Sequence, residues 1–210
     1  MWWMVFLGAS LAVALTPGAN NLLGMHHAVH HGAGRAARAL SGRLAAFALL
    51  IAAVVAGLGP LLAASRPALT AITWAGAAYL VWLGMRMILA TFRDGSPPSG
   101  HPAAAPAGGR PDDRLVRKEF LVAITNPKAL LLFTAFLPQF VEPAAGPVAL
   151  QLVVLGASYL LVEAVAGTAY VLIGSALRAV RLSARAQRRV DRGTGAVLLG
   201  MAGALALSRP

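Results

Sequence analysis

Apolar residues run through this chain in blocks of about twenty, and short polar stretches separate the blocks. A helix of about 20 apolar residues spans the ~30 Å hydrocarbon core of a bilayer. The composition agrees, because 58% of the 210 residues are hydrophobic and only 12% are charged. A soluble domain carries about 25% charged residues. We therefore predict an all-α integral membrane protein, with the lipid bilayer covering its apolar surface.

Six such blocks can be recognised, and we expect each to form one transmembrane helix. They cover Trp2–Gly24, Leu44–Ala64, Ala68–Ala90, Glu119–Phe140, Pro147–Ser175 and Gly193–Ser208. The N-terminal block lacks a preceding basic region and a clear small-residue cleavage site. It is therefore expected to be a retained span and not a cleaved signal peptide.

The positive charges are confined to alternate junctions between the blocks. Fifteen of the eighteen Lys and Arg residues lie at the first, third and fifth junctions. In a six-span chain these junctions share one side of the membrane, and the positive-inside rule makes that side cytoplasmic. Both termini are then expected outside. This placement also accounts for the net charge of +11, so nucleic acid is not expected as a partner.

The third junction divides the chain into two halves. Residues 94–113 contain five Pro and four Gly, which is typical of a flexible linker without a fold of its own. The predicted units are a three-helix repeat in residues 1–93, this cytoplasmic linker, and a second three-helix repeat in residues 114–210. Because three spans is an odd number, the repeats must have opposite topology. Inverted repeats are a recurring construction of secondary transporters, with the solute site at their interface.

The first helix of each half is interrupted by proline beside polar residues. The interruptions read TPGANN at 16–21 and TNPK at 125–128. Proline frees the carbonyl four residues earlier, and such groups need protein or a wet cavity around them in a membrane. Either these are ordinary proline kinks, or they mark a site between the repeats. On the second interpretation the substrate-binding residues are Thr16, Pro17, Gly18, Asn20, Asn21, Asn126, Pro127 and Lys128.

Lys128 and Glu163 are the ionisable residues near the middle of the apolar blocks. Placing an isolated charge there costs about 2.5–3.5 kcal/mol on insertion scales, so each needs a partner or a cavity. One interpretation is a fixed ion pair that ties the fourth span to the fifth. The other is functional: Lys128 holds a carboxylate, and Glu163 binds an ammonium group or a proton in turn and couples transport to protons.

Four histidines, His26, His27, His30 and His31, follow the first block. Histidines at positions i and i+4 share a helical face and can bind Zn²⁺ or Ni²⁺. The chain has no Cys, and no acidic residue is close in sequence to complete a site. We therefore predict interfacial residues at the cytoplasmic mouth, a helix end at Gly32, and neither a metal site nor a cofactor.

Several motifs resemble those of the LysE/RhtB family of amino-acid exporters, in the same order and over nearly the whole chain. They are TPGAN at 16–20, HG at 31–32, WAGAAYL at 74–80, LG at 83–84, TNPK at 125–128 and LPQF at 137–140. Ala19 departs from the family, which usually has a second Pro there, and Glu163 falls where relatives often carry an acidic residue. The resemblance implies a translocator in a bacterial inner membrane that exports amino acids or close derivatives, driven by the proton gradient.

Other functions fit the residues less well. A membrane-embedded enzyme would need a clustered acid–base or metal constellation, so we predict that the chain is not an enzyme. A metal-ion exporter would use the histidines and more carboxylates than Glu163 alone. No nucleotide-binding P-loop is present in the sequence. The Gly- and Ala-rich spans would also suit packing between copies of the chain as a homo-oligomer.

Overall fold

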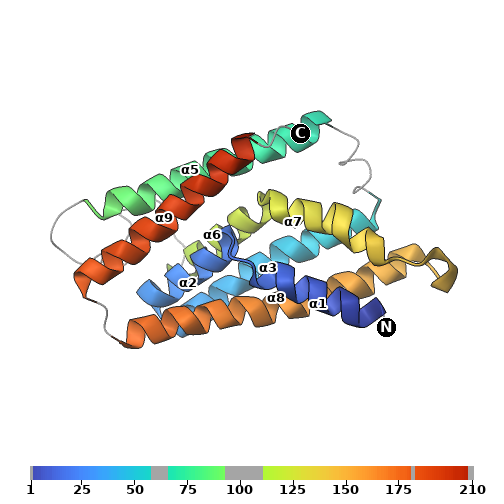
Figure 1. The fold of residues 1–210 in the computed structure, drawn as a ribbon, viewed down its shortest axis with the longest axis horizontal. Helices are drawn as coiled ribbons and strands as arrows, with labels where there is room; N and C mark the ends of the chain where they lie inside the picture. Colours follow the sequence, from blue (N-terminus) through green and yellow to red (C-terminus); the bar gives the residue numbers. More distant parts are fainter. Residues whose placement is uncertain (1, 58–65, 93–110, 181–182, 208–210) are drawn as a thin grey trace.

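The computed structural model describes residues 2–57, 66–92, 111–180 and 183–207, and every element in these ranges is helical (Figure 1). The helices are α1 (Trp2–Leu15), α2 (Ala19–His31), α3 (Ala33–Val55), α5 (Arg66–Ala90), α6 (Pro111–Ile124), α7 (Pro127–Leu131), α8 (Val148–Ala179) and α9 (Ala184–Leu207). A π-helical turn (Leu132–Phe136) and two 3₁₀ turns (Leu137–Phe140 and Pro143–Ala145) join α7 to α8.

The described helices include two that are long and apolar enough to cross a bilayer, α3 and α8. Two bent pairs, α1 with α2 and α6 with α7 and its following turns, pass the same test together and raise the number to as many as 4. The all-helical membrane character is thus confirmed, whereas six spans in two inverted repeats remain a prediction.

The helices extend beyond several predicted boundaries. Helix α3, which corresponds to the second predicted block, begins at Ala33 and not at Leu44, because its Ala-rich start continues the helix through a basic segment. Helix α6 begins at Pro111, so the last three residues of the predicted linker are helical, with two Asp residues at the positive end of the helix dipole. The rest of that linker, residues 94–110, and residues 58–64 of the second block lie outside the described residues.

Helices α5 and α9 lie side by side and run antiparallel (Figure 1). Their contact depends on Gly84 and Gly195, which face each other. A Cβ atom on Gly84 would lie 2.8 Å from the Gly195 carbonyl oxygen, closer than real Cβ atoms approach. Small residues of this kind let membrane helices come close enough for extensive van der Waals contact.

The remaining helices form a second group in which α3 packs on α6 and α8, and α2 packs on α8. Two glycines set the spacing of these contacts. A Cβ on Gly42 of α3 would lie 2.1 Å from the carbonyl oxygen of Val116 in α6. A Cβ on Gly174 of α8 would lie 2.4 Å from the carbonyl oxygen of Met25 in α2. The described backbones therefore meet without intervening side chains at both places.

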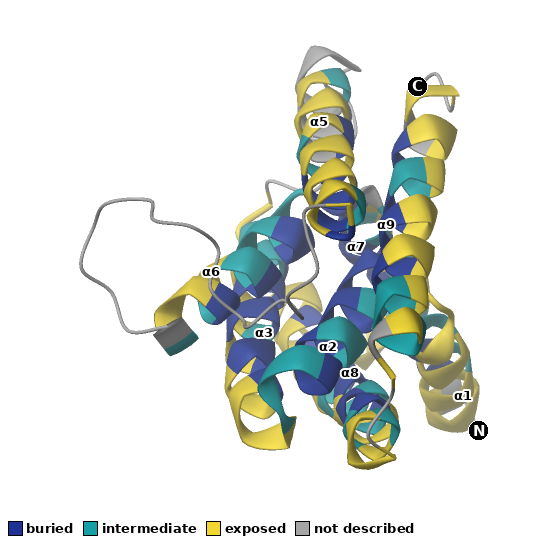
Figure 2. Cartoon of the chain, turned by 90° about the vertical axis from the view of Figure 1, so that its left-hand side faces the viewer, coloured by how far each residue is buried: buried dark blue, intermediate teal, exposed yellow. Residues whose placement is uncertain are grey.

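The outer faces of the helices are exposed (Figure 2), and many of the exposed residues are large and apolar. On α8, for example, Leu161 is 71% exposed and Val165 is 66% exposed, while Phe6 and Phe133 are fully buried inside. Extended apolar patches of this kind are rare on monomeric soluble proteins. Lipid is the solvent that suits them, and the chain is a membrane-embedded protein.

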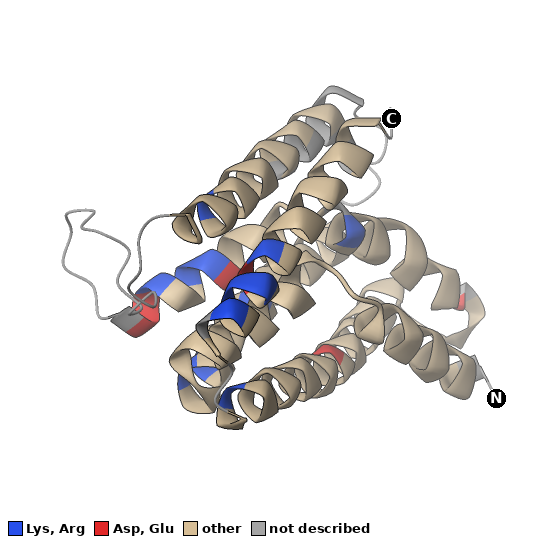
Figure 3. Ribbon diagram, turned by 60° about the vertical axis from the view of Figure 1, so that its left-hand side comes forward, with Lys and Arg blue, Asp and Glu red and all other residues tan. Residues whose placement is uncertain are grey.

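The basic residues gather towards one end of the helices, over the beginnings of α6 and α9 (Figure 3). The beginning of α3 and the end of α8 add Arg35, Arg38 and Arg178. We call this region the arginine-rich end. It agrees with the alternation of charge expected from the sequence.

Candidate functional site

Both predicted interruptions are present, and each bends its helix pair by 57°. The first lies between Leu15 and Ala19, where the chain leaves α1 and enters α2. The second lies between Ile124 and Pro127, where α6 gives way to α7. In both, a threonine just after the last helical residue donates its hydroxyl to the carbonyl four residues back, Thr16 to Ala12 and Thr125 to Leu121.

At the first break, side chains take up the free carbonyl groups at the end of α1. Lys128 Nζ donates to the Val13 carbonyl at 2.7 Å and lies 3.4 Å from that of Thr16. Asn21 Nδ2 donates to the carbonyls of Ala14 and Thr16. The hydroxyl of Tyr170, from α8, completes the set by donating to the Leu15 carbonyl at 2.9 Å. These carbonyls lack helical partners, and an ammonium group is well placed at the negative end of the α1 dipole.

The second break satisfies its own backbone. Asn126 is the N-cap of α7, and its Oδ1 accepts from the Lys128 backbone N–H at 3.0 Å. The Ala123 carbonyl, which Pro127 frees, accepts from the Asn126 N–H in a tighter turn at 3.2 Å. The backbone groups at this break therefore need few hydrogen bonds from the rest of the molecule.

The two breaks meet each other although about a hundred residues separate them. Asn126 Nδ2 donates to Asn20 Oδ1 at 2.9 Å, and both side chains are buried. The bond from Lys128 to Val13 crosses the same junction. The structure thus brings together the polar groups of both interruptions, and the carbonyl that Pro17 frees is bonded by the lysine that follows Pro127.

Arg43 lies behind the first break and is 1% exposed. Its Nε donates to Glu119 Oε2 at 3.0 Å, and its Nη1 lies 3.1 Å from Glu163 Oε1. Nη1 also donates to Asn21 Oδ1 at 2.9 Å, and Nη2 donates to the Asn20 carbonyl. One guanidinium therefore holds two carboxylates and the first turn of α2. We refer to Arg43, Glu119 and Glu163 as the buried charge cluster.

The buried charge cluster holds one guanidinium against two carboxylates. Its neighbours are Tyr159, whose hydroxyl donates to Glu163 Oε2 at 3.2 Å, and His27, whose Nδ1 lies 3.5 Å from Glu119 Oε1. With both carboxylates ionised, Arg43 leaves one negative charge unbalanced. A proton on a carboxylate or on His27 would balance it, which matters because isolated charges are costly in low dielectric.

A pocket opens beside the junction of the two breaks. It has an empty volume of about 330 Å³, including its open mouth. Its lining includes Gly18, Asn20, Asn21, Asn126, Lys128 and Glu163, together with Ala14, Phe47, Ala129, Leu132 and Tyr159. Thr16 and Pro17 are exposed and do not line it, and the side chain of Pro127 lies outside the described part of the chain.

No ion pair joins Lys128 to Glu163 within the described structure, so the fixed pair considered from the sequence is not found. Lys128 bonds carbonyl groups, and Glu163 bonds Arg43 and Tyr159. Sequence reasoning missed Arg43 and Glu119 because both stand at the edges of apolar blocks, where charges are usually solvated. Their separation of 76 residues gave no signal that they would meet.

The histidine region is only partly as expected. Helix α2 ends at His31, and Gly32 follows with φ of 87°, a left-handed conformation that suits glycine. No acidic residue is close to the histidines in sequence, but one reaches them through the fold. Asp191 of α9 lies against His26 and His30, because α2 packs on a helix more than 150 residues later in the chain.

The chain is similar to several known proteins. The family model described as LysE type translocator matches residues 11–209. A homoserine/homoserine lactone efflux protein of Salmonella typhi is 28% identical over 208 residues, which are 99% of this chain and 97% of that protein. A leucine efflux protein of Klebsiella pneumoniae is 29% identical over 143 residues, which are 67% of this chain and 63% of that protein. An uncharacterized membrane protein of Pseudomonas aeruginosa is 31% identical over 205 residues, which are 95% of this chain and 91% of that protein.

No solved structure matches the chain significantly. The family match nevertheless extends over both proline breaks, the buried charge cluster and the pocket between them. On the strength of that match, the chain belongs to the LysE type translocator family.

Proposed function

We propose that this chain exports amino acids or close derivatives across a bacterial inner membrane and couples export to proton entry. The observation that carries the proposal is the meeting of two proline breaks, one from each half, at a pocket lined by Lys128 and Glu163. Efflux functions in the names of the Salmonella and Klebsiella relatives support it. The equal bends of the two pairs support a pair of inverted three-helix repeats.

The pocket offers complementary groups for a zwitterion. The end of α1 presents carbonyl groups, which attract an ammonium. Lys128 and the first turn of α2 attract a carboxylate, and the N-cap of α2, Gly18, contributes no side-chain hydrogen bond that would block those N–H groups. A substrate that takes up the carbonyl groups would release Lys128 for its carboxylate.

Glu163 is the proposed coupling residue because it belongs to the buried charge cluster and also lines the pocket. A proton arriving there would remove the unbalanced negative charge and weaken the bond to Arg43. Since Arg43 also holds Asn20 and Asn21, protonation would loosen the first turn of α2. Substrate movement and proton movement would then depend on one another.

Efflux from cells loaded with dipeptides tests the proposal. Cells that express the protein should release one or more amino acids faster than cells with an empty vector, homoserine and leucine being the first candidates. Glu163→Gln should lose the dependence of efflux on the proton gradient, whereas Glu142→Gln, at an exposed position, should keep it. Unchanged efflux of every amino acid upon expression would contradict the proposed function.

We infer further that the arginine-rich end faces the cytoplasm and that both termini are outside. The charge alternation supports this orientation. Reporters that are active on only one side of the membrane can be fused at residue 104 and at the C-terminus. The fusion at residue 104 should report the cytoplasm and the C-terminal fusion the outside; the reverse result would invert the topology.

A further inference from the structure

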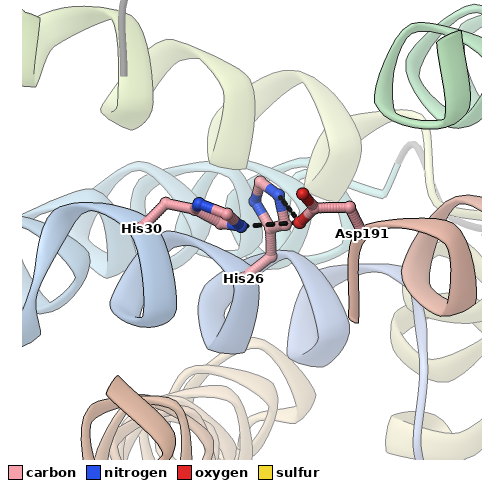
Figure 4. Close-up of side chains that lie close together, drawn as sticks. All are labelled: His26, His30 and Asp191. Atoms are coloured by element: carbon pink, nitrogen blue, oxygen red, sulfur yellow. Dashed lines mark hydrogen bonds and ion pairs between the residues drawn. The ribbon is translucent and has the colours of Figure 1, made fainter. Parts of the chain in front are cut away.

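Three side chains with metal-binding atoms converge between α2 and α9. His26 and His30 stand one turn apart on α2, and the carboxylate of Asp191 from α9 points towards both rings (Figure 4). His26 Nε2 lies 3.2 Å from Asp191 Oδ1, and His30 Nε2 lies 2.6 Å from the same oxygen. The three nearest ligand atoms all lie within 4.8 Å of one another.

We propose that His26, His30 and Asp191 bind a divalent transition-metal ion of the zinc class. Two imidazoles and a carboxylate are a common protein ligand set for Zn²⁺, with water in the fourth position. Metal–ligand bonds of about 2.0–2.1 Å in a tetrahedron place the ligand atoms roughly 3.3 Å apart. The distance from His26 Nε2 to Asp191 Oδ1 already matches that value, and His30 Nε2 would need to move away from the same oxygen by less than about 1 Å.

The polar atoms of this cluster are not fully paired by the described residues. Nδ1 of His26 is buried without a hydrogen-bond partner among the described residues, and such an atom is costly to leave unpaired. Both Nε2 atoms are directed at a single carboxylate oxygen, which binds two rings less well than a cation would. A metal ion would accept the Nε2 lone pairs of both rings, which a shared carboxylate oxygen cannot do.

Nearby positive charges are directed away from the cluster. Arg192 follows Asp191 in sequence, but its Nε donates to Thr91 Oγ1 at 2.9 Å and its guanidinium lies over the Phe92 ring. His27 faces Glu119 on another side of α2. The side chains of His26 and His30 remain 18% and 10% exposed, so an ion can reach them.

The position of the site gives the ion a structural consequence. Helix α2 follows the first proline break, whereas α9 is the last helix of the second half. An ion bound to both would cross-link the halves and favour the arrangement in which they lie together. Binding would therefore raise the thermal stability of the folded protein as the free ion concentration increases.

Cobalt titration of the purified protein, without a histidine tag and after chelator treatment, tests the proposal. We expect one Co²⁺ per chain with the absorption bands of a tetrahedral site, displacement by Zn²⁺, and a higher melting temperature with metal. Asp191→Asn and His30→Gln should weaken binding at least about tenfold. His31→Gln, one residue further along α2 and outside the cluster, should bind as the wild type does.

Several results would overturn the site. They are no stoichiometric binding by the wild type, equal binding by Asp191→Asn, or an equal loss in His31→Gln. X-ray absorption of the zinc-loaded wild type tests the site without relying on variants that can misfold. It should show two imidazoles with the remaining ligands oxygen, and any other ligand set would reject the assignment.

Discussion

The two proline breaks look alike in sequence and bend their helices equally, yet the structure holds them in different ways. At the second, Asn126 caps α7, and the tighter turn bonds the carbonyl of Ala123. At the first, Asn21 bonds two carbonyls locally, but further bonds come from residues distant in sequence: Arg43 from α3, Lys128 from the other half, and Tyr170 from α8.

This difference suggests where the molecule can change. A break that is held by local bonds keeps its shape whatever its neighbours do. A break that is held by two charged side chains changes when either one exchanges or loses a partner, as when Lys128 binds a substrate carboxylate or Glu163 beside Arg43 takes up a proton. The first break is therefore the expected moving part, and the second is its rigid counterpart.

Of the substitutions that test this difference between the two breaks, Arg43→Gln should have the largest effect. The change leaves Glu119 and Glu163 buried without their cation and frees the first turn of α2. Removing one partner of a buried ion pair costs about 3–5 kcal/mol, so we expect loss of folded protein in detergent and of export. Arg38→Gln on the same helix is the control, because its partner Asp112 is more exposed and such pairs contribute about 0–1 kcal/mol. Equal stability of the two variants would contradict the role of Arg43.

Lys128→Met should have the next largest effect. It leaves the Val13 carbonyl with only its long 3.3 Å bond from the Thr16 N–H, at a cost of about 1–3 kcal/mol, and removes the proposed ligand for the carboxylate. We expect the variant to insert and remain monodisperse while export is abolished. Lys118→Met, earlier on α6 and away from the pocket lining, should retain export. Export by Lys128→Met at the wild-type rate would exclude Lys128 from the transport path.

Asn126→Ala should have the smallest effect, because it removes one cap and one bond to the first break. Loss of an N-cap costs about 0.5–2 kcal/mol. Thermal unfolding of Asn20→Ala, Asn126→Ala and the double variant can be compared as a cycle. Their shared hydrogen bond predicts a coupling energy of about 0.5–1.5 kcal/mol, whereas strictly additive effects would show that the two breaks act separately.

The sequence predicted much of this arrangement because apolar length, charge alternation and proline are local signals. Helical membrane character, both interruptions and the helix end at Gly32 follow from such signals. The partners of Lys128 and Glu163 could not be predicted in the same way. Arg43 and Asp191 meet their partners only through helix packing, and a single sequence does not show which faces of two helices are in contact.

Thiol labelling tests the central claim most directly, since the chain contains no Cys of its own. Ala14 and Ala129 line the pocket from different halves and are 2% and 3% exposed, whereas Ala46 is fully buried and does not line the pocket. Single Ala14→Cys and Ala129→Cys variants should react with a water-soluble thiol reagent, and an exported amino acid should slow both reactions. Ala46→Cys should stay unlabelled. If the two pocket positions remain unlabelled with and without substrate, or if substrate protects neither, the two breaks do not form one substrate pocket.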